Sequence, residues 1–163
     1  MQGVTIRPIA PGDNAAMADI IRRSLEEFGA ARPGTVYYDD STDHLFELFQ
    51  STPQSAYYVA VKKDGLLVGG AGIFPTEGLP QDTCELVKMY LSPAARGLGL
   101  GRFMIDQCLL KAKENGFQSV YLETMPELKK AVSVYEKFGF TYLKGPMGNS
   151  GHNGCDIWML KTL

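Results

Sequence analysis

The chain has 163 residues, of which 45% are apolar and 21% charged, and its formal net charge is −2 at pH 7. This length suits a single domain, residues 1–163, with a sizeable hydrophobic core. The composition is typical of a globular protein, and the weak negative charge argues against a nucleic-acid partner. No apolar run is long enough to cross a bilayer, so no membrane partner is expected.

The N-terminal residues and the cysteines predict a reducing, cytoplasmic setting. Met1 to Thr5 lacks the basic start and apolar run of a secretory signal. Cys84, Cys108 and Cys155 are odd in number and widely spaced, and they form no Cys-x-x-Cys pair. A disulfide framework is therefore not expected.

Periodicity and turn residues predict strands and helices in a definite order. The strands are expected at residues 4–9, 56–62, 66–74, 83–91, 119–124, 140–144 and 155–163. The helices are expected from Asp13 or Asn14 to Gly29, from Thr42 or Asp43 to Pro53, from a glycine-rich loop to Asn115, and from Pro126 to Gly139. Glycines in the third strand, Gly69, Gly70 and Gly72, suggest a bulge or close packing.

This order joins an antiparallel half to a half with helical crossovers. It predicts an α/β (α+β) fold, with a mixed central sheet of about seven strands and about four helices on both faces.

A glycine-rich loop joins the strand at residues 83–91 to the helix that follows. Arg96 and Arg102 flank glycines at Gly97, Gly99 and Gly101. Bare backbone N–H groups can approach an anion closely there, and the positive end of a helix favours negative charge. The arginines add donors that pair with phosphate. The loop therefore predicts a pyrophosphate cradle, and the alternative is a connector without a ligand.

The spacing of this loop separates it from two common nucleotide loops. Gly101 is followed by Arg102-Phe103, whereas a Walker A loop needs Gly-Lys-Ser/Thr. The Gly-x-Gly-x-Gly spacing also differs from the Gly-x-Gly-x-x-Gly of dinucleotide sites. Arg96 to Gly101 instead matches Arg-x-x-Gly-x-Gly and resembles the coenzyme-A loop of the GNAT superfamily of acyl-CoA-dependent N-acyltransferases. The order of elements is also similar to that family over nearly the whole chain.

A second motif strengthens the resemblance. The run from Ala131 to Phe140 resembles the family's Ala-x-x-x-Tyr-Glu-Lys-x-Gly-Phe signature. In many members this tyrosine protonates the departing thiolate, which implies Tyr135 as the general acid. The alternative is a core aromatic whose hydroxyl is satisfied elsewhere. One departure is Leu128, where many members carry an asparagine that contacts the cofactor.

Glu85 is the candidate general base. It lies six residues before Leu91, where several GNAT enzymes place a glutamate that deprotonates the amine. Period-two alternation predicts that Glu85, Val87, Met89 and Leu91 share one face of the strand. Apolar neighbours would raise the pKa of the carboxyl, which suits a base. The alternative is a solvated glutamate at a strand end.

The resemblance also implies the cofactor, acetyl-CoA, and the residues that hold it. In the family, backbone groups at the end of the strand before the loop pair with the pantetheine arm. The implied cofactor residues are Met89, Tyr90, Leu91, Arg96, Gly97, Leu98, Gly99, Leu100, Gly101 and Arg102. No metal is expected.

The acceptor site is the least specified part. In the family, the first two helices and their loop usually wall it, which implies Tyr37, Tyr38 and Asp39. Aromatic faces and carboxylates suit a cationic amine, although such a loop is equally an ordinary solvated surface. His152 and Cys155 lack a second pair to complete a metal site, and a mobile loop is the preferred interpretation there.

These features predict an N-acetyltransferase that moves an acetyl group from acetyl-CoA to a primary amine by direct transfer. The acceptor would be a small-molecule amine or a protein amino group. The alternative is a non-catalytic acyl-CoA-binding sensor of the same fold, and a nucleotide-binding domain of another class is disfavoured by the missing Lys-Ser/Thr. An uncovered sheet edge could pair two copies, so a homodimer is a further expectation.

Overall fold

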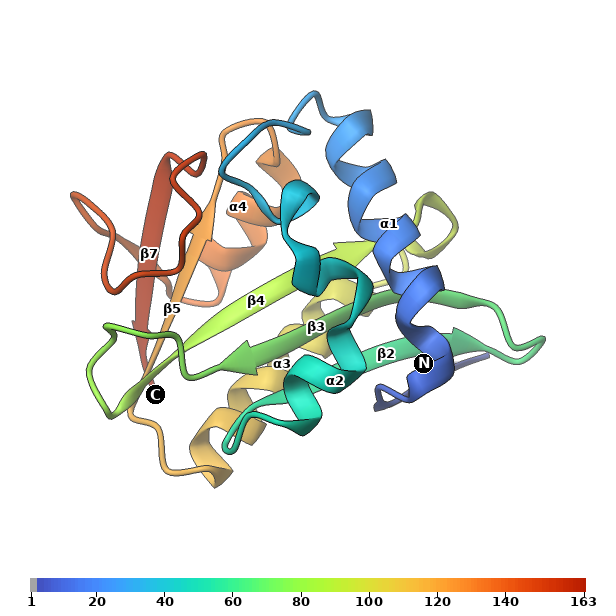
Figure 1. Ribbon diagram of the computed structural model, residues 1–163, viewed down its shortest axis with the longest axis horizontal. Coiled ribbons are helices and arrows are strands. Elements are labelled where there is room, and N and C mark those ends of the chain that lie inside the picture. Colours follow the sequence, from blue (N-terminus) through green and yellow to red (C-terminus); the bar gives the residue numbers. More distant parts are fainter. Residues whose placement is uncertain (1–2) are drawn as a thin grey trace.

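The computed structural model describes residues 3–163, in which seven strands form one sheet in the order β1-β2-β3-β4-β5-β7-β6 (Figure 1). The strands are β1 (Val4–Pro8), β2 (Ala56–Lys62), β3 (Leu67–Phe74), β4 (Thr83–Leu91), β5 (Ser119–Thr124), β6 (Thr141–Tyr142) and β7 (Ile157–Thr162). Strands β4 and β5 are parallel, and the other neighbours are antiparallel. The predicted mixed sheet is confirmed.

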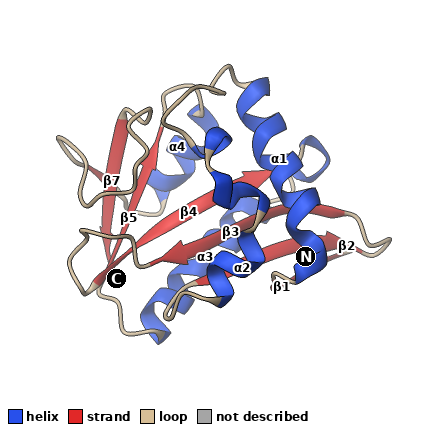
Figure 2. Ribbon diagram, viewed as in Figure 1, coloured by secondary structure: helices blue, strands red, loops and turns tan. Residues whose placement is uncertain are grey.

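Helices cover both faces of this sheet, as Figure 2 shows, and the predicted two-sided arrangement is confirmed. The helices are α1 (Asn14–Glu27), α2 (Leu45–Gln50), α3 (Leu100–Glu114) and α4 (Lys129–Lys137). On one face, α1 and α2 bury a core that includes Ile21 and Leu45. On the other, α3 and α4 bury a core that includes Met104 and Tyr135. Among the described residues, no helix has the length and apolarity needed to span a membrane.

The bounds of most elements agree with the sequence-based prediction, and four differ. Helix α2 is shorter than predicted at both ends, and β7 begins at Ile157 rather than Cys155. Helix α4 begins at Lys129 rather than at Pro126. Pro126 instead belongs to a turn before the helix, in which the Leu128 N–H donates a hydrogen bond to the Met125 carbonyl. The predicted strand at 140–144 keeps only Thr141–Tyr142. The long loop before α2 contains two short 3-10 turns.

The glycines of β3 allow its close packing against β2. A Cβ at Gly70 would lie 2.7 Å from the hydroxyl of Tyr57, and one at Gly72 would lie 2.4 Å from the Ala56 carbonyl oxygen. The space left by these glycines holds the Tyr57 side chain, which is 2% exposed. Its hydroxyl donates a hydrogen bond of 2.6 Å to the carbonyl of Lys88 in β4. The close packing expected from these glycines is therefore confirmed.

Strand β4 carries a bulge at this point. Gly70 pairs with Tyr90 and Gly72 with Val87, so Ala71 alone opposes both Lys88 and Met89. Lys88 adopts the left-handed region, with φ of 51°. A side chain in that region costs about 1–2 kcal/mol, which the Tyr57 hydrogen bond helps to offset.

The bulge changes which side chains of β4 share a face. Met89 and Leu91 pack with Leu86 against the α3 side, whereas Val87 packs on the α1 side. The prediction that Glu85, Val87, Met89 and Leu91 share one face is therefore wrong. Period-two alternation fails here because a bulge inserts an extra residue and shifts its phase.

Replacing Tyr57 by Phe tests the support of the bulge. The Lys88 carbonyl would lose its donor inside the protein, so the free energy of unfolding should fall by about 1–2 kcal/mol. Urea denaturation measures this loss. The matched control is Tyr58→Phe, whose side chain packs on the opposite face of the sheet. An equal loss in both variants would show that the bond to Lys88 has no special part in stability.

Candidate active site

Strands β4 and β5 separate beyond a short paired segment. Their parallel pairing runs only from Thr83–Ser119 to Glu85–Tyr121, and the two strands then diverge (Figure 1). A cavity of about 640 Å³ lies at this opening. Its walls include residues 85–91 of β4, the glycine-rich loop, the end of β5 and the start of α4, together with the end of α1 and the loop before β7. The backbone of β4 is thus accessible where a parallel partner strand would otherwise cover it.

The glycine-rich loop presents the start of α3 to this cavity. Gly97 and Gly99 adopt φ of 78° and 76°, a conformation that side chains rarely take. Helix α3 begins at Leu100, and no side chain caps its first N–H groups. A Cβ on Gly97 or Gly99 would meet nothing within 4 Å, so the space beside the loop is open. Free N–H groups and the helix dipole can therefore bind an anion here.

The side chain of Arg96 braces the loop. Its guanidinium donates to the Leu91 carbonyl at 3.2 and 3.1 Å, pairs with Glu27 at 2.5 Å and lies over the Phe28 ring at 5.1 Å. These contacts tie the loop to α1 and to the end of β4. Arg96 and Arg102 both line the cavity, and the sequence had suggested both as partners of a pyrophosphate.

Glu85 is buried at the other end of the cavity. The residue is only 3% exposed, and its carboxylate accepts a hydrogen bond of 2.6 Å from the Thr76 hydroxyl. Burial raises the pKa of Glu85 to about 7, the Thr76 hydrogen bond opposes this rise, and the nearby charge of Glu123 adds to it. A carboxyl that is half ionised near neutral pH is suited to accept a proton from an amine.

The Thr76 hydrogen bond gives a specific pH prediction. The hydroxyl stabilises the ionised carboxylate, so Thr76→Val should raise the pKa of Glu85 by about one unit. If the ionised form is the active base, the rise of kcat/KM with pH should move to higher pH by the same amount. A pH–rate profile measures the shift, and Thr83→Val, a buried threonine at the start of β4, is the control. An unmoved profile would contradict the role of Thr76.

Two side chains that the sequence analysis did not assign to the site, Glu123 and His152, lie near Glu85. Glu123 accepts hydrogen bonds from Tyr121 at 2.6 Å and from Ser150 at 2.5 Å. The imidazole of His152 lies 2.5 Å from the Asp39 carboxylate. One ligand atom each of Glu85, Glu123 and His152 lies within 4.8 Å of the others, a spacing that could hold a cation.

The sequence alone gives no clear signal for either of these two residues. Glu123 lies two positions after Tyr121, which pairs with Glu85 in the parallel register. Its side chain could have been placed near Glu85 had the register been known. His152 comes from the loop before β7 and carries no local signal, and the structure places it in the cavity wall.

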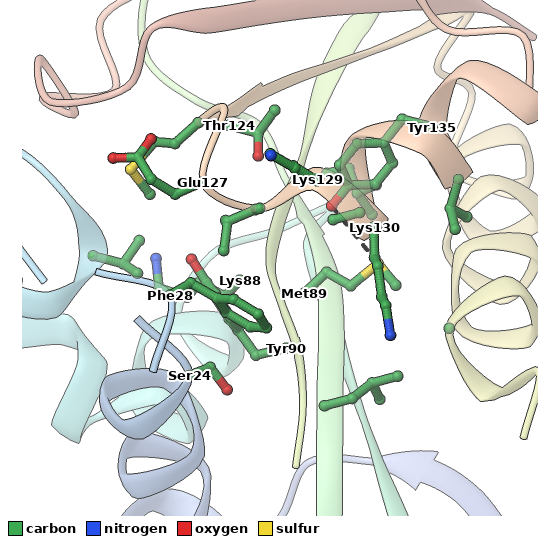
Figure 3. Close-up of a pocket in the computed structure, with 18 of the residues that line it drawn as sticks. Ser24, Phe28, Lys88, Met89, Tyr90, Thr124, Glu127, Lys129, Lys130 and Tyr135 are labelled. Carbon is green, nitrogen blue, oxygen red and sulfur yellow. Dashed lines mark hydrogen bonds between the residues drawn. The ribbon is translucent and has the colours of Figure 1, made fainter. Parts of the chain in front are cut away.

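Tyr135 occupies the α4 side of the cavity. It is 6% exposed, and its hydroxyl contacts the Met89 sulfur at 3.8 Å (Figure 3). Its ring packs edge-on against Phe140. Burial raises the pKa of Tyr135 well above its usual value, which keeps the hydroxyl protonated. The side chain is therefore a hydrogen-bond donor that already contacts a sulfur atom.

The remaining predicted residues are placed as follows. Met89, Tyr90 and Leu91 line the cavity from β4, and Leu128 lines it from the turn before α4. Of the predicted acceptor residues, Asp39 contacts the cluster through His152. Burial acts to raise the pKa of Asp39, but the hydrogen bond to His152 and the nearby charges of His152 and Lys88 together outweigh it, and the net shift is downward. The rings of Tyr37 and Tyr38 pack against each other, 4.9 Å apart, and Tyr38 is 60% exposed.

Comparisons with known proteins agree with this architecture. Residues 16–140 match the acetyltransferase (GNAT) family. The chain is 39% identical to an uncharacterised N-acetyltransferase of Escherichia coli, YjgM, over 163 residues that cover 99% of this chain and 96% of that protein.

Solved structures of the same fold extend over the whole chain. A GNAT acetyltransferase from Staphylococcus aureus superposes with a TM-score of 0.86 at 16% identity, covering 98% of both chains. A phosphinothricin acetyltransferase from Sinorhizobium meliloti, solved in complex with AcCoA, superposes with a TM-score of 0.76 at 18% identity, covering 99% of this chain and 89% of that one.

The sheet opens beside β4, and the glycine-rich loop and the start of α3 lie at the opening. The chain belongs to the GNAT acetyltransferase family. It is accordingly an N-acetyltransferase of that family, as its sequence motifs predict.

Proposed function

We propose that the chain transfers the acetyl group directly to a primary amine, with Glu85 as general base and Tyr135 as general acid. The observation that carries this proposal is that one cavity contains both groups. A buried carboxyl with a pKa of about 7 stands at one end, and a protonated hydroxyl in contact with sulfur stands on the α4 side.

The cofactor would lie along the opening between β4 and β5. The N–H groups at the start of α3, together with Arg102, would bind its pyrophosphate. The unpaired edge of Met89–Leu91 would hydrogen-bond the pantetheine arm as an added strand does. The Tyr135 hydroxyl contacts the Met89 sulfur in the structure. The thioester sulfur of the cofactor would lie in the same region, within reach of this hydroxyl.

The proposed reaction proceeds without a covalent enzyme intermediate. The amine gives a proton to Glu85, its nitrogen attacks the thioester carbonyl carbon, and the C–S bond breaks. The Tyr135 hydroxyl donates to the departing sulfur and recovers its proton from solvent. Because a thiol has a pKa of about 8.5, below that of the buried tyrosine, hydrogen bonding to the thiolate is the larger part of this assistance.

The setting proposed for this activity is a single domain, residues 1–163, in a reducing, cytoplasmic compartment. All three cysteines are unpaired in the structure, which supports a reducing environment. We propose that no metal takes part, because Glu85 and Tyr135 can provide the proton transfers at the amine and at the departing sulfur.

The test is release of free coenzyme A from acetyl-CoA with a panel of primary amines, amino acids and peptides. Amine-dependent release, unchanged after treatment with EDTA, is the expected result. Loss of activity with EDTA and recovery with a divalent ion would instead assign a metal to Glu85, Glu123 and His152. Binding of acetyl-CoA without release for any acceptor would favour the sensor function.

A further inference from the structure

Lys88 brings a cation into the acceptor end of the cavity. Its side chain lines the cavity wall (Figure 3). Glu85 and His152 line the same cavity. Within residues 3–163, its ammonium forms no ion pair and no hydrogen bond. Burial lowers the pKa of Lys88, and the charges of Asp39 and Glu85, which lie nearby without contacting the ammonium, oppose this shift. Each of those two carboxylates is already hydrogen-bonded, to His152 and to Thr76 respectively.

The backbone of β4 is shaped to hold Lys88 in this position. Regular alternation would send residue 88 to the side of Leu86, into the core beneath α3. The bulge and the positive φ keep Lys88 on the side of Glu85 instead, and the Tyr57 hydroxyl holds its carbonyl. Strained backbone of this kind persists where the position of the side chain is used.

The carboxylates around Lys88 differ from it in having partners of their own. Glu123 accepts from Tyr121 and Ser150, just as Asp39 and Glu85 have their donors. A partly buried ammonium without a counterpart is unfavourable unless a ligand supplies an anion. This end of the cavity therefore contains Glu85, a base that can accept a proton from an amine, and Lys88, an ammonium that is unpaired within the described part of the chain and can bind a carboxylate.

We propose that the acceptor is a small amine that carries a carboxylate, such as a free α-amino acid, and that Lys88 binds this carboxylate. This inference rests on the proposed function, since it places the amine at Glu85. The amine of a protein N-terminus or of a lysine side chain has no carboxylate beside it. The cavity of about 640 Å³ must also take the acetylated arm of the cofactor, which favours a small acceptor.

Matched substrate pairs test this proposal. The rate of coenzyme A release is compared for L-leucine and 3-methylbutylamine, and for L-phenylalanine and 2-phenylethylamine, in which hydrogen replaces the carboxylate. We expect kcat/KM to favour the amino acid by about 10- to 100-fold, the contribution of one charge-assisted hydrogen bond. An equal or greater kcat/KM for the amines would overturn the proposal.

A substitution assigns the preference to Lys88. In Lys88→Met, KM for the amino acid should rise by about 10- to 100-fold with kcat retained, because uniform binding energy is lost. The preference for the amino acid over its amine should then fall to near one, and Lys88→Arg should restore part of it. Lys137→Met, at an exposed position on α4, is the control and should keep the full preference.

Three outcomes separate the possible failures. If Lys88→Met lowers the rates for amino acid and amine equally and leaves their ratio unchanged, Lys88 serves Glu85 rather than the substrate, and the proposal is wrong. If peptides are acetylated but free amino acids are not, the proposal is wrong while the proposed function stands. If no acceptor releases coenzyme A, the proposed function fails, and the inference that rests on it fails too.

Discussion

Replacing Glu85 by Gln should lower kcat/KM at neutral pH by about 10²- to 10³-fold, the usual contribution of a general base. The amide keeps the size of the side chain but cannot take a proton from the amine. Binding of acetyl-CoA should be retained, because the loop from Arg96 to Arg102 lies at the other end of the cavity. Isothermal titration with acetyl-CoA and initial rates of coenzyme A release measure the two effects separately.

The direction in which kcat/KM changes with pH also tests the role of Glu85. Glu85 acts in its deprotonated form, and burial raises its pKa to about 7. The kcat/KM of the wild-type enzyme should therefore increase as pH rises through about 7 and then level off. In Glu85→Gln this limb should disappear. Glu114→Gln, at the exposed end of α3, is the matched control. A variant at Glu85 with full activity at neutral pH would refute the assignment of the base.

Replacing Tyr135 by Phe should lower kcat by about 10- to 100-fold and leave KM for acetyl-CoA nearly unchanged. The ring would keep its packing against Phe140, so the loss is confined to the hydroxyl. An interaction that forms with the departing thiolate, and not with the bound thioester, changes kcat rather than binding. Steady-state kinetics with varied acetyl-CoA provide the measurement.

The control for Tyr135→Phe is Tyr142→Phe, which removes a hydroxyl from the exposed strand β6. The choice of acceptor provides a second check. Because the hydroxyl acts on the leaving group, kcat should fall by the same factor for every amine. A loss that depended strongly on the amine would place Tyr135 in acceptor binding instead.

Most of the fold could be predicted from the sequence because its signals are local. Asp64-Gly65 marks the turn between β2 and β3, and both strands were placed within one residue. Gly116 and Gly139, with φ of 90° and 89°, end α3 and α4 as expected. The start of α4 was less well predicted, because the turn before it depends on a backbone hydrogen bond that the residue types do not specify.

The site was predicted in part, and the omissions have a common physical cause. Glu85 and Tyr135 lie within recognisable motifs, and the structure brings both to one cavity. The bulge at Lys88 depends on Tyr57, 31 positions earlier in the chain, so alternation alone could not reveal it. His152 reaches Asp39 across 113 positions. Contacts of such long range are set by the assembled sheet, and no local pattern reports them.

Only three residue pairs join β4 to β5 in the described chain, from Thr83–Ser119 to Glu85–Tyr121. This seam is the hydrogen-bonded connection between the two halves of the sheet, β1–β4 and β5–β7. A cofactor lying in the opening would bridge the halves and act as part of the scaffold. By mass action, acetyl-CoA at a hundredfold excess over its Kd adds about 2.7 kcal/mol to the free energy of unfolding. The resistance of this enzyme to heat would then follow the acetyl-CoA supply around it.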